Sequence, residues 1–280
     1  MSRLQRTALL FPGQGSQEPG MKEKVAAQCP ELLELANELV GDDPFERVND
    51  GTRFAQPAIY CASIAGWQEA GSPEAECIAG HSLGELAALA AGGAISIEDG
   101  LRIAATRGTL MQRAAEADGE SGMLALLGPG ETSREIAKRH GLTPANDNAP
   151  DQLVVAGHDD DLAAARKDAR AAGLRAVRLP IRGAFHSPAM EPVVGEFRAA
   201  LDEIDFSEPK VPVYSCTAAA PFTDPREELA GALVRPVRWR ETMRALWARG
   251  IERFIETGPG KVLTGLVERN LSERPEAAHA

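Results

Sequence analysis

The chain has 280 residues, of which 44% are hydrophobic and 25% charged, with a formal net charge of -11. The composition is that of an ordinary soluble globular protein. The acidic balance argues against a general affinity for nucleic acid, and no apolar stretch reaches the roughly 20 residues that span a bilayer.

The cysteines and histidines indicate neither disulfides nor a metal site. No CxxC pair occurs among Cys29, Cys61, Cys77 and Cys216. Reduced thiols are therefore expected in a chain of this length. The five histidines include no HExxH or similar ligand spacing, so we expect no metal. The N-terminus lacks the long apolar region of a secretory signal, and we expect a cytoplasmic location.

The first part of the chain alternates strands, tight loops and helices. The expected elements are a buried strand at 7–11, a loop at 12–17, helices at 31–40 and 58–70, a strand at 77–79, a turn at 80–85, and helices at 86–91 and about 97–115. Pro57 is assigned to the first turn of its helix, where proline is favoured. The alternation predicts a parallel sheet covered by helices.

The middle of the chain has another rhythm. Its expected elements are strands at 123–127, 142–146, 152–156 and 174–179, with helices at 131–139 and 160–172. The order βαββαβ predicts a ferredoxin-like subdomain. With seams at 119–122 and 180–183, the subdomain covers 121–183, and 1–120 with 184–280 form the body. Strands are expected again near 211–214 and 253–256, and the tail from Ser272 is polar.

The pentapeptide Gly80–Gly84 (GHSLG) is a GxSxG pattern between a short apolar run and an amphipathic helix. A sharp strand-to-helix turn exposes the serine oxygen, so Ser82 is a candidate nucleophile. The helix that follows adds free N–H groups and a partial positive charge where an oxyanion would form. The alternative is a glycine-rich turn in which the serine only caps the helix.

A serine hydroxyl needs a base, and His186 lies in a loop punctuated by glycine and proline, where catalytic groups are common. The alternative is a surface histidine in a turn. His81 is expected to pack or to form a hydrogen bond, because neighbours on a tight turn point apart. His140 ends a helix, His158 closes a strand and His279 lies in the tail.

Several ordered blocks resemble one family. They are Phe11–Gln17 (FPGQGSQ), Gly80–Glu85 (GHSLGE), Arg107–Gly108, Gly183–Ser187 (GAFHS) and Gly258–Leu263 (GPGKVL), with weaker similarity at Asn146–Asn148 and Gln152–His158. Together they closely resemble malonyl-CoA:acyl carrier protein transacylases and the acyltransferase domains of polyketide synthases. The resemblance runs from about Ala8 to Arg269. It implies an α/β fold: an α/β-hydrolase-like parallel-sheet body with an inserted ferredoxin-like subdomain.

The family's roles carry over onto matching positions. Ser82 would be acylated, and His186 would take its proton and later activate the acceptor thiol. A backbone carbonyl from the segment 231–235, rather than an aspartate, would orient the histidine. The backbone N–H groups of Leu83 and Gln14 would form the oxyanion hole.

Arg107 lies within an expected helix and would ordinarily be solvated. The resemblance places it instead in the pocket, paired with the free carboxylate of malonate. Its planar fork suits a carboxylate, and a buried guanidinium rejects uncharged acyl chains.

Phe185 precedes the catalytic histidine. In polyketide synthase relatives a phenylalanine there accompanies malonyl and a serine accompanies methylmalonyl, so Phe185 favours malonyl. The side chains of Gln17, Met123, Asn146 and Asn148 are further candidates to line the cleft.

The resemblance implies ping-pong transfer of malonyl from malonyl-CoA to the phosphopantetheine thiol of an acyl carrier protein, in fatty acid or polyketide biosynthesis. No cofactor is implied, and the family is usually monomeric. One alternative is a hydrolase on the same scaffold that strips acyl groups from carrier proteins. Another is a docking protein without activity, against which the joint presence of Ser82, His186 and Arg107 counts.

Overall fold

The computed structural model describes residues 6–273, and its central sheet is built around a strand that is buried from Ala8 to Phe11. The sheet has the order β8-β7-β2-β1-β9. Its strands are β1 (Thr7–Phe11), β2 (Cys77–Gly80), β7 (Val213–Ser215), β8 (Ala220–Pro221) and β9 (Arg253–Glu256). β1 runs parallel to β2 and β9, and β2 runs parallel to β7, whereas β8 closes an antiparallel hairpin with β7.

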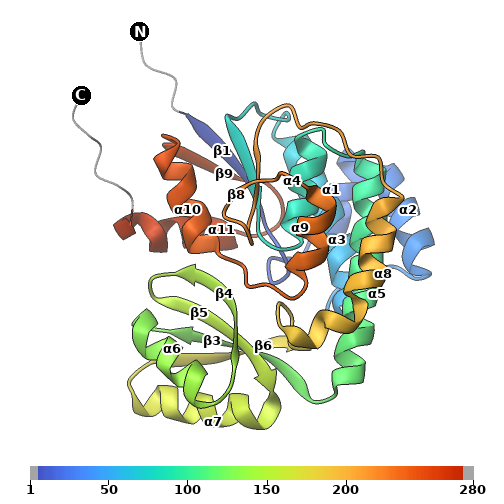
Figure 1. Cartoon of the computed structure of the whole chain (residues 1–280). Helices are drawn as coiled ribbons and strands as arrows, with labels where there is room; N and C mark the ends of the chain where they lie inside the picture. The colour runs from blue at the N-terminus through green and yellow to red at the C-terminus, as the bar shows by residue number, and fades with distance from the viewer. Residues whose placement is uncertain (1–5, 274–280) are drawn as a thin grey trace, which may run out of the picture.

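Helices cover both faces of this sheet (Figure 1). They are α1 (Met21–Gln28), α2 (Pro30–Val40), α3 (Thr52–Glu69), α4 (Gly84–Ala91), α5 (Ile97–Asp118), α8 (Glu191–Asp202), α9 (Pro225–Ala232), α10 (Trp239–Ala248) and α11 (Val262–Asn270), with 3-10 turns at Pro188–Met190 and Leu271–Glu273. Side chains of β1 alternate between two cores, as a doubly covered strand requires. Leu9 and Phe11 join the core of α1, α3, α4 and α5, and Leu10 joins that of α10 and α11.

A second, antiparallel sheet has the order β4-β5-β3-β6. Its strands are β3 (Ser121–Leu127), β4 (Thr143–Ala149), β5 (Gln152–His158) and β6 (Arg175–Arg182), and the helices α6 (Gly130–Arg139) and α7 (Asp159–Ala171) connect them. The first and third strands are central neighbours, which is the ferredoxin-like arrangement. Leu124 and Leu126 face α6 and α7, while Met123 and Ala125 face the main core. The fold is thus a hydrolase-like α/β body with an inserted ferredoxin-like subdomain.

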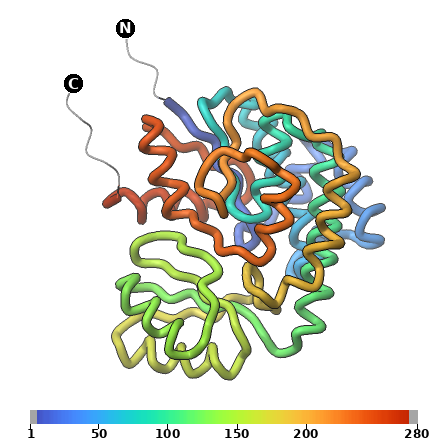
Figure 2. The backbone as a smooth tube through the Cα atoms, in the orientation of Figure 1, coloured from blue at the N-terminus to red at the C-terminus, as the bar shows by residue number. Residues whose placement is uncertain are grey.

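Backbone contacts fix the subdomain on the body. The chain enters at Ser121 and leaves after Arg182 side by side, and Gly183 N donates to Ser121 O at 3.0 Å (Figure 2). On the far side, Val237 N donates to Ala145 O at 2.8 Å and Asp147 N donates to Val237 O at 2.8 Å. The sheet ends at the predicted seams, and we propose the division at 120/121 and 183/184 as the domain boundaries.

The predicted start of the second helix is wrong. α3 begins at Thr52, so Pro57 lies inside the helix rather than in its first turn. Proline lacks an N–H and leaves the carbonyl of Arg53 without its intrahelical donor, but the first turn of α3 is buried against α5 and this packing outweighs the loss. Helices α1 and α8 to α11 have no counterpart among the predicted elements.

The remaining predicted features fall as follows. His140 ends α6, with its Nε2 3.0 Å from Asp168 Oδ2, and His158 precedes the first turn of α7. His279 and the tail from residue 274 lie outside the described residues. Between residues 6 and 273, no helix combines the length and apolar character that crossing a membrane requires.

Candidate active site

Ser82 occupies the turn between β2 and α4 in a left-handed backbone conformation, with φ of 53°. The turn is so tight that positions 80 and 84 leave no room for a side chain. A Cβ on Gly80 would lie 2.1 Å from the carbonyl carbon of Gly84, and one on Gly84 would lie 2.1 Å from Phe11 O. The spacing of the GxSxG pattern is therefore set by the packing of this turn on the end of β1.

His186 follows β6 and reaches the serine from the other side. Its Nε2 lies 2.8 Å from Ser82 Oγ. Its Nδ1 lies 2.8 Å from the backbone oxygen of Ala232 and 3.1 Å from that of Arg235. Carbonyl oxygens only accept, so Nδ1 carries the proton and Nε2 is free to accept the serine proton. The carbonyl that orients the histidine comes from the end of α9.

Burial and the charge of Arg107 lower the pKa of His186 to about 3. The side chain is 4% exposed, so a charged imidazole would be poorly solvated. The histidine is therefore neutral near pH 7, as a general base must be.

Arg107 lies in the middle of α5 and is 4% exposed, not solvated. Its Nη2 donates to Ser82 Oγ at 3.1 Å, and its Nη1 donates to Gln56 Oε1 at 2.9 Å. Burial lowers its pKa to about 10, partly offset by Glu85, so it stays charged at neutral pH. Within the described part of the chain, no carboxylate forms an ion pair with it. A buried cation thus lies beside the nucleophile without a counter-ion in contact.

Gln56 is a site residue that the sequence reasoning missed. It is 1% exposed on α3 and faces Arg107 because the two helices approach closely at Gly108. A Cβ on Gly108 would lie 2.7 Å from Thr52 O and 3.3 Å from Gln56 Cβ. The sequence signal for Gln56 was a single amide on an otherwise apolar helix face. It was not used because the predicted helix began after Pro57 and so did not include Gln56.

The two residues predicted for the oxyanion hole lie on loops that touch. Leu83 precedes α4, and Gln14 follows Gly13, whose Cβ would lie 2.5 Å from His81 O. In residues 6–273, neither the Leu83 N–H nor the Gln14 N–H has an acceptor within the chain. Two free donors on abutting loops beside a serine are suited to stabilise an oxyanion.

Glu85 supports the nucleophile from beneath and was also missed. It is 1% exposed, and its Oε1 accepts from the backbone N–H of Cys216 at 2.6 Å. Cys216 Sγ in turn accepts from the backbone N–H of Ser82 at 3.4 Å. Burial raises the pKa of Glu85 to about 7.

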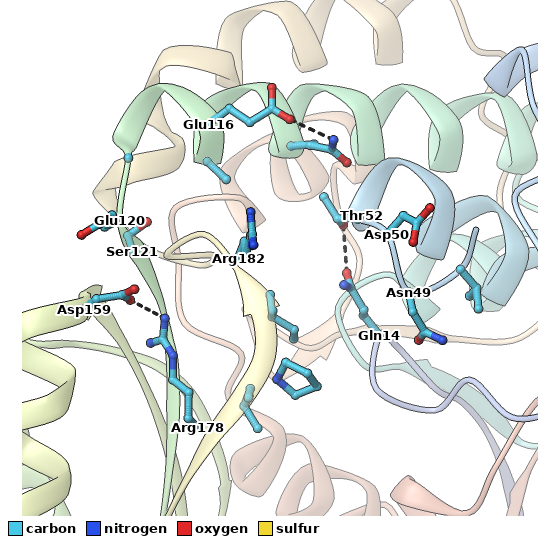
Figure 3. A pocket seen from close by; sticks show the side chains of 18 of the residues that line it. Gln14, Asn49, Asp50, Thr52, Glu116, Glu120, Ser121, Asp159, Arg178 and Arg182 are labelled. Carbon is cyan, nitrogen blue, oxygen red and sulfur yellow. Dashed lines mark hydrogen bonds and ion pairs between the residues drawn. The ribbon is translucent and has the colours of Figure 1, made fainter. Parts of the chain in front are cut away.

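A cavity of about 940 Å³ opens between the subdomain and the body (Figure 3). Gln14, Gln17 and Thr52 line one wall, and β6 from Arg178 to Arg182 lines the opposite one. Of the other predicted cleft residues, Asn148 Oδ1 instead lies 2.9 Å from His81 Nε2, whose ring packs on Trp239.

The side chains of Met123 and Phe185 pack in the main core rather than on the cavity wall. Phe185 directly precedes His186 and is 4% exposed. Asn146 does not line the cavity either and pairs through its backbone with Val237.

Known proteins are similar to this chain in sequence and in fold. The chain is 39% identical to the polyketide biosynthesis protein ThaF of Burkholderia thailandensis over 98% of its length, although it spans only 25% of that protein. It is 37% identical to the malonyl CoA-acyl carrier protein transacylase of Salmonella typhimurium, covering 94% of this chain and 92% of the relative. The crystal structure of malonyl CoA-acyl carrier protein transacylase from Burkholderia pseudomallei superposes with a TM-score of 0.89 at 33% identity, covering 97% and 99% of the two chains.

The sequence model described as acyl transferase domain matches residues 8–280. The match covers nearly the whole chain, and the structure brings a serine, a histidine and an arginine together. The chain belongs to the acyl transferase family.

Proposed function

We propose that the protein transfers a malonyl group from malonyl-CoA to the phosphopantetheine thiol of an acyl carrier protein, in fatty acid or polyketide biosynthesis. Its family and the names of its relatives support this proposal. No relative that we compared is named as a hydrolase, so the editing alternative has no support.

The observation that carries the proposal is the buried, unpaired guanidinium of Arg107, 3.1 Å from Ser82 Oγ. A buried charge without a counter-ion is costly, and a malonyl group carries its free carboxylate one carbon beyond the reacting thioester. The carboxylate would take over the Nη2 donor that now contacts the serine. An acetyl group would leave the charge unpaired, which gives the selectivity.

The reaction follows from the same contacts. Ser82 Oγ attacks the thioester carbon while His186 Nε2 takes its proton, and the N–H groups of Leu83 and Gln14 stabilise the tetrahedral oxyanion. Coenzyme A leaves as a thiol with the proton from His186, and the malonyl ester of Ser82 remains. The carrier thiol then loses its proton to His186 and attacks that ester, so the serine is regenerated. No further cofactor takes part.

Substrate size and setting complete the proposal. Phe185 packs in the main core directly before His186, so the preference for malonyl over methylmalonyl rests on the resemblance, and one methyl group discriminates by only about 1–3 kcal/mol. We further propose a cytoplasmic monomer. All four cysteines are buried free thiols, as a reducing compartment would maintain them.

Intact-protein mass spectrometry after addition of malonyl-CoA tests the proposal. Wild type should gain one malonyl group, and Ser82→Ala should gain none. Arg107→Ala should slow malonylation roughly a hundredfold, which corresponds to a rise of about 3 kcal/mol in the activation free energy. The rate of acetylation by acetyl-CoA should not change. Arg113→Ala, on the same helix but exposed and paired with Glu196, is the matched control. An adduct on Ser82→Ala, or malonate released in place of malonyl-carrier protein, would contradict the proposal.

A further inference from the structure

A continuous chain of side-chain hydrogen bonds leads from the nucleophile to the loop of Gln14. Arg107 Nη1 donates to Gln56 Oε1 at 2.9 Å, and Gln56 Nε2 lies 2.9 Å from Thr52 Oγ1. Thr52 Oγ1 lies 2.9 Å from Gln14 Oε1 (Figure 3). Four side chains from three separate segments are joined in this way.

The arginine gives the chain a single direction. A guanidinium only donates, so Gln56 must accept through its oxygen and donate through its nitrogen. Thr52 then accepts from Gln56, and its own proton is left for Gln14 Oε1. The charge of Arg107 fixes the orientation of the Gln56 amide, and in the structure Thr52 Oγ1 donates to Gln14 Oε1.

Within this series of hydrogen bonds, Thr52 is a residue to which the proposed reaction assigns no step. It is 4% exposed at the start of α3, and α5 holds this turn in place through the bond from Arg53 N to Gln112 Oε1 at 3.2 Å. Gln14, by contrast, sits on a surface loop and lines the cavity. Among the described residues, the hydroxyl of Thr52 is the one side-chain group bonded to Gln14.

We propose that Thr52 is a positioning residue, which anchors the Gln14 loop to the Arg107 chain and thereby holds the Gln14 N–H beside the nucleophile. Gln14 Nε2 is then turned away from the anchor and remains available as a donor toward the cavity. The residue that recognises the substrate carboxylate and the loop that receives the oxyanion are in this way mechanically connected.

The test compares Thr52→Val, which keeps the shape but loses the hydroxyl, with Thr52→Ser, which keeps the hydroxyl. Two rates are measured by intact mass. One is malonylation by malonyl-CoA, which rests on the proposed function. The other is labelling by a fluorophosphonate, which forms a bond from Ser82 Oγ to phosphorus with loss of fluoride and needs no malonyl specificity. Thr242→Val removes a buried hydroxyl bonded to Arg238 O, away from the site, and serves as the control.

Thr52→Val should slow both reactions by at least about tenfold. The maximal rate constant should fall while the half-saturating concentration stays unchanged, because a displaced donor stabilises only the transition state less well. Thr52→Ser should restore the rate, and Thr242→Val should leave it unchanged. Gln14→Met breaks the same contact from the other end, and adding Thr52→Val to it should cost little more. This second variant keeps the test decisive if Thr52→Val does not fold.

Wild-type rates in Thr52→Val, equal slowing in Thr52→Ser, or additive effects in the double variant would overturn the inference. If wild type is not malonylated but Thr52→Val still slows fluorophosphonate labelling, the proposed function fails and the positioning role stands.

Discussion

At the scale of single residues, the site requires that His186 stays neutral while the neighbouring Arg107 is charged. Arg107 is buried and charged, and its field, together with burial, keeps the nearby His186 neutral. A base with a lowered pKa accepts the serine proton less readily, but it is never lost to protonation near neutral pH. Besides the substrate role proposed for it, the arginine thus helps to keep the imidazole neutral.

We expect the acylation rate to stay level as pH falls from 7.5 to 5, because His186 becomes protonated only near its pKa of about 3. In Arg107→Ala the neighbouring charge is gone, so the acid limb of the profile should move to higher pH. Fluorophosphonate labelling across this range measures both. An inflection near 6.5 in wild type would show that the imidazole is solvated.

The residues expected to react or to bind substrate could be predicted, whereas the residues that position them could not. Ser82 lies in a local motif whose residue types indicate a role, whereas Arg107 was placed in the pocket by the family resemblance alone. Gln56, Thr52 and Glu85 act through hydrogen bonds between segments far apart in sequence, and no local pattern marks such contacts. The carbonyl that orients His186 could be placed only within a five-residue segment. Every residue carries a backbone oxygen, so residue types do not show which one accepts.

At the scale of elements, the approach of α3 to α5 determines the surroundings of Arg107. The two helices touch at Gly108, one residue after Arg107, and this closeness brings Gln56 and Thr52 into reach. Every described strand except β8 followed from apolar runs and periodicity, as did helices α2 to α7, whereas α1 and α8 to α11 did not follow. The first turn of α3 did not, because burial against α5 outweighs the local preference of Pro57.

Gly108→Ala should lower the free energy of unfolding by about 1–3 kcal/mol, because its Cβ would press on backbone atoms of α3 that cannot rotate away. It should also reduce the preference for malonyl-CoA over acetyl-CoA by moving Gln56 relative to Arg107. Urea unfolding and the two acylation rates measure these effects. The control is Gly195→Ala in α8, where the Cβ meets nothing within 4 Å and about 0.5–1 kcal/mol of added stability is expected. Equal behaviour of the two variants would contradict the role of the helix contact.

At the scale of the whole molecule, two buried groups couple stability to pH in opposite senses. His186 is neutral when folded, so only the unfolded chain takes up its proton between pH 6.5 and about 3, and stability falls as pH falls. Glu85 has its pKa raised to about 7, so the folded chain holds a proton that the unfolded chain has released above about 4.5. Its contribution is present at low pH and is lost as pH rises through 7. Over the shared window the two effects largely cancel.

Glu85→Gln removes one side of this balance. Between pH 7 and pH 5 the variant should lose roughly 2 kcal/mol of unfolding free energy more than wild type does, since about 1.4 kcal/mol per pH unit then acts through His186 alone. Urea unfolding of both proteins at the two pH values measures the difference, and any constant cost of the substitution drops out. An equal response of the two proteins would mean that Glu85 is already ionised at pH 5.

The partner of His186 Nδ1 has a consequence for how this enzyme can change. The nearer acceptor is the peptide oxygen of Ala232, and the second is that of Arg235, so the hydrogen bonds do not depend on which side chain either residue carries. Replacing a side chain there therefore leaves the acceptor oxygen of Ala232 in the backbone. Only a shift of the end of α9 can remove it, so damage to the base would come from insertions, deletions or a proline that bends the segment.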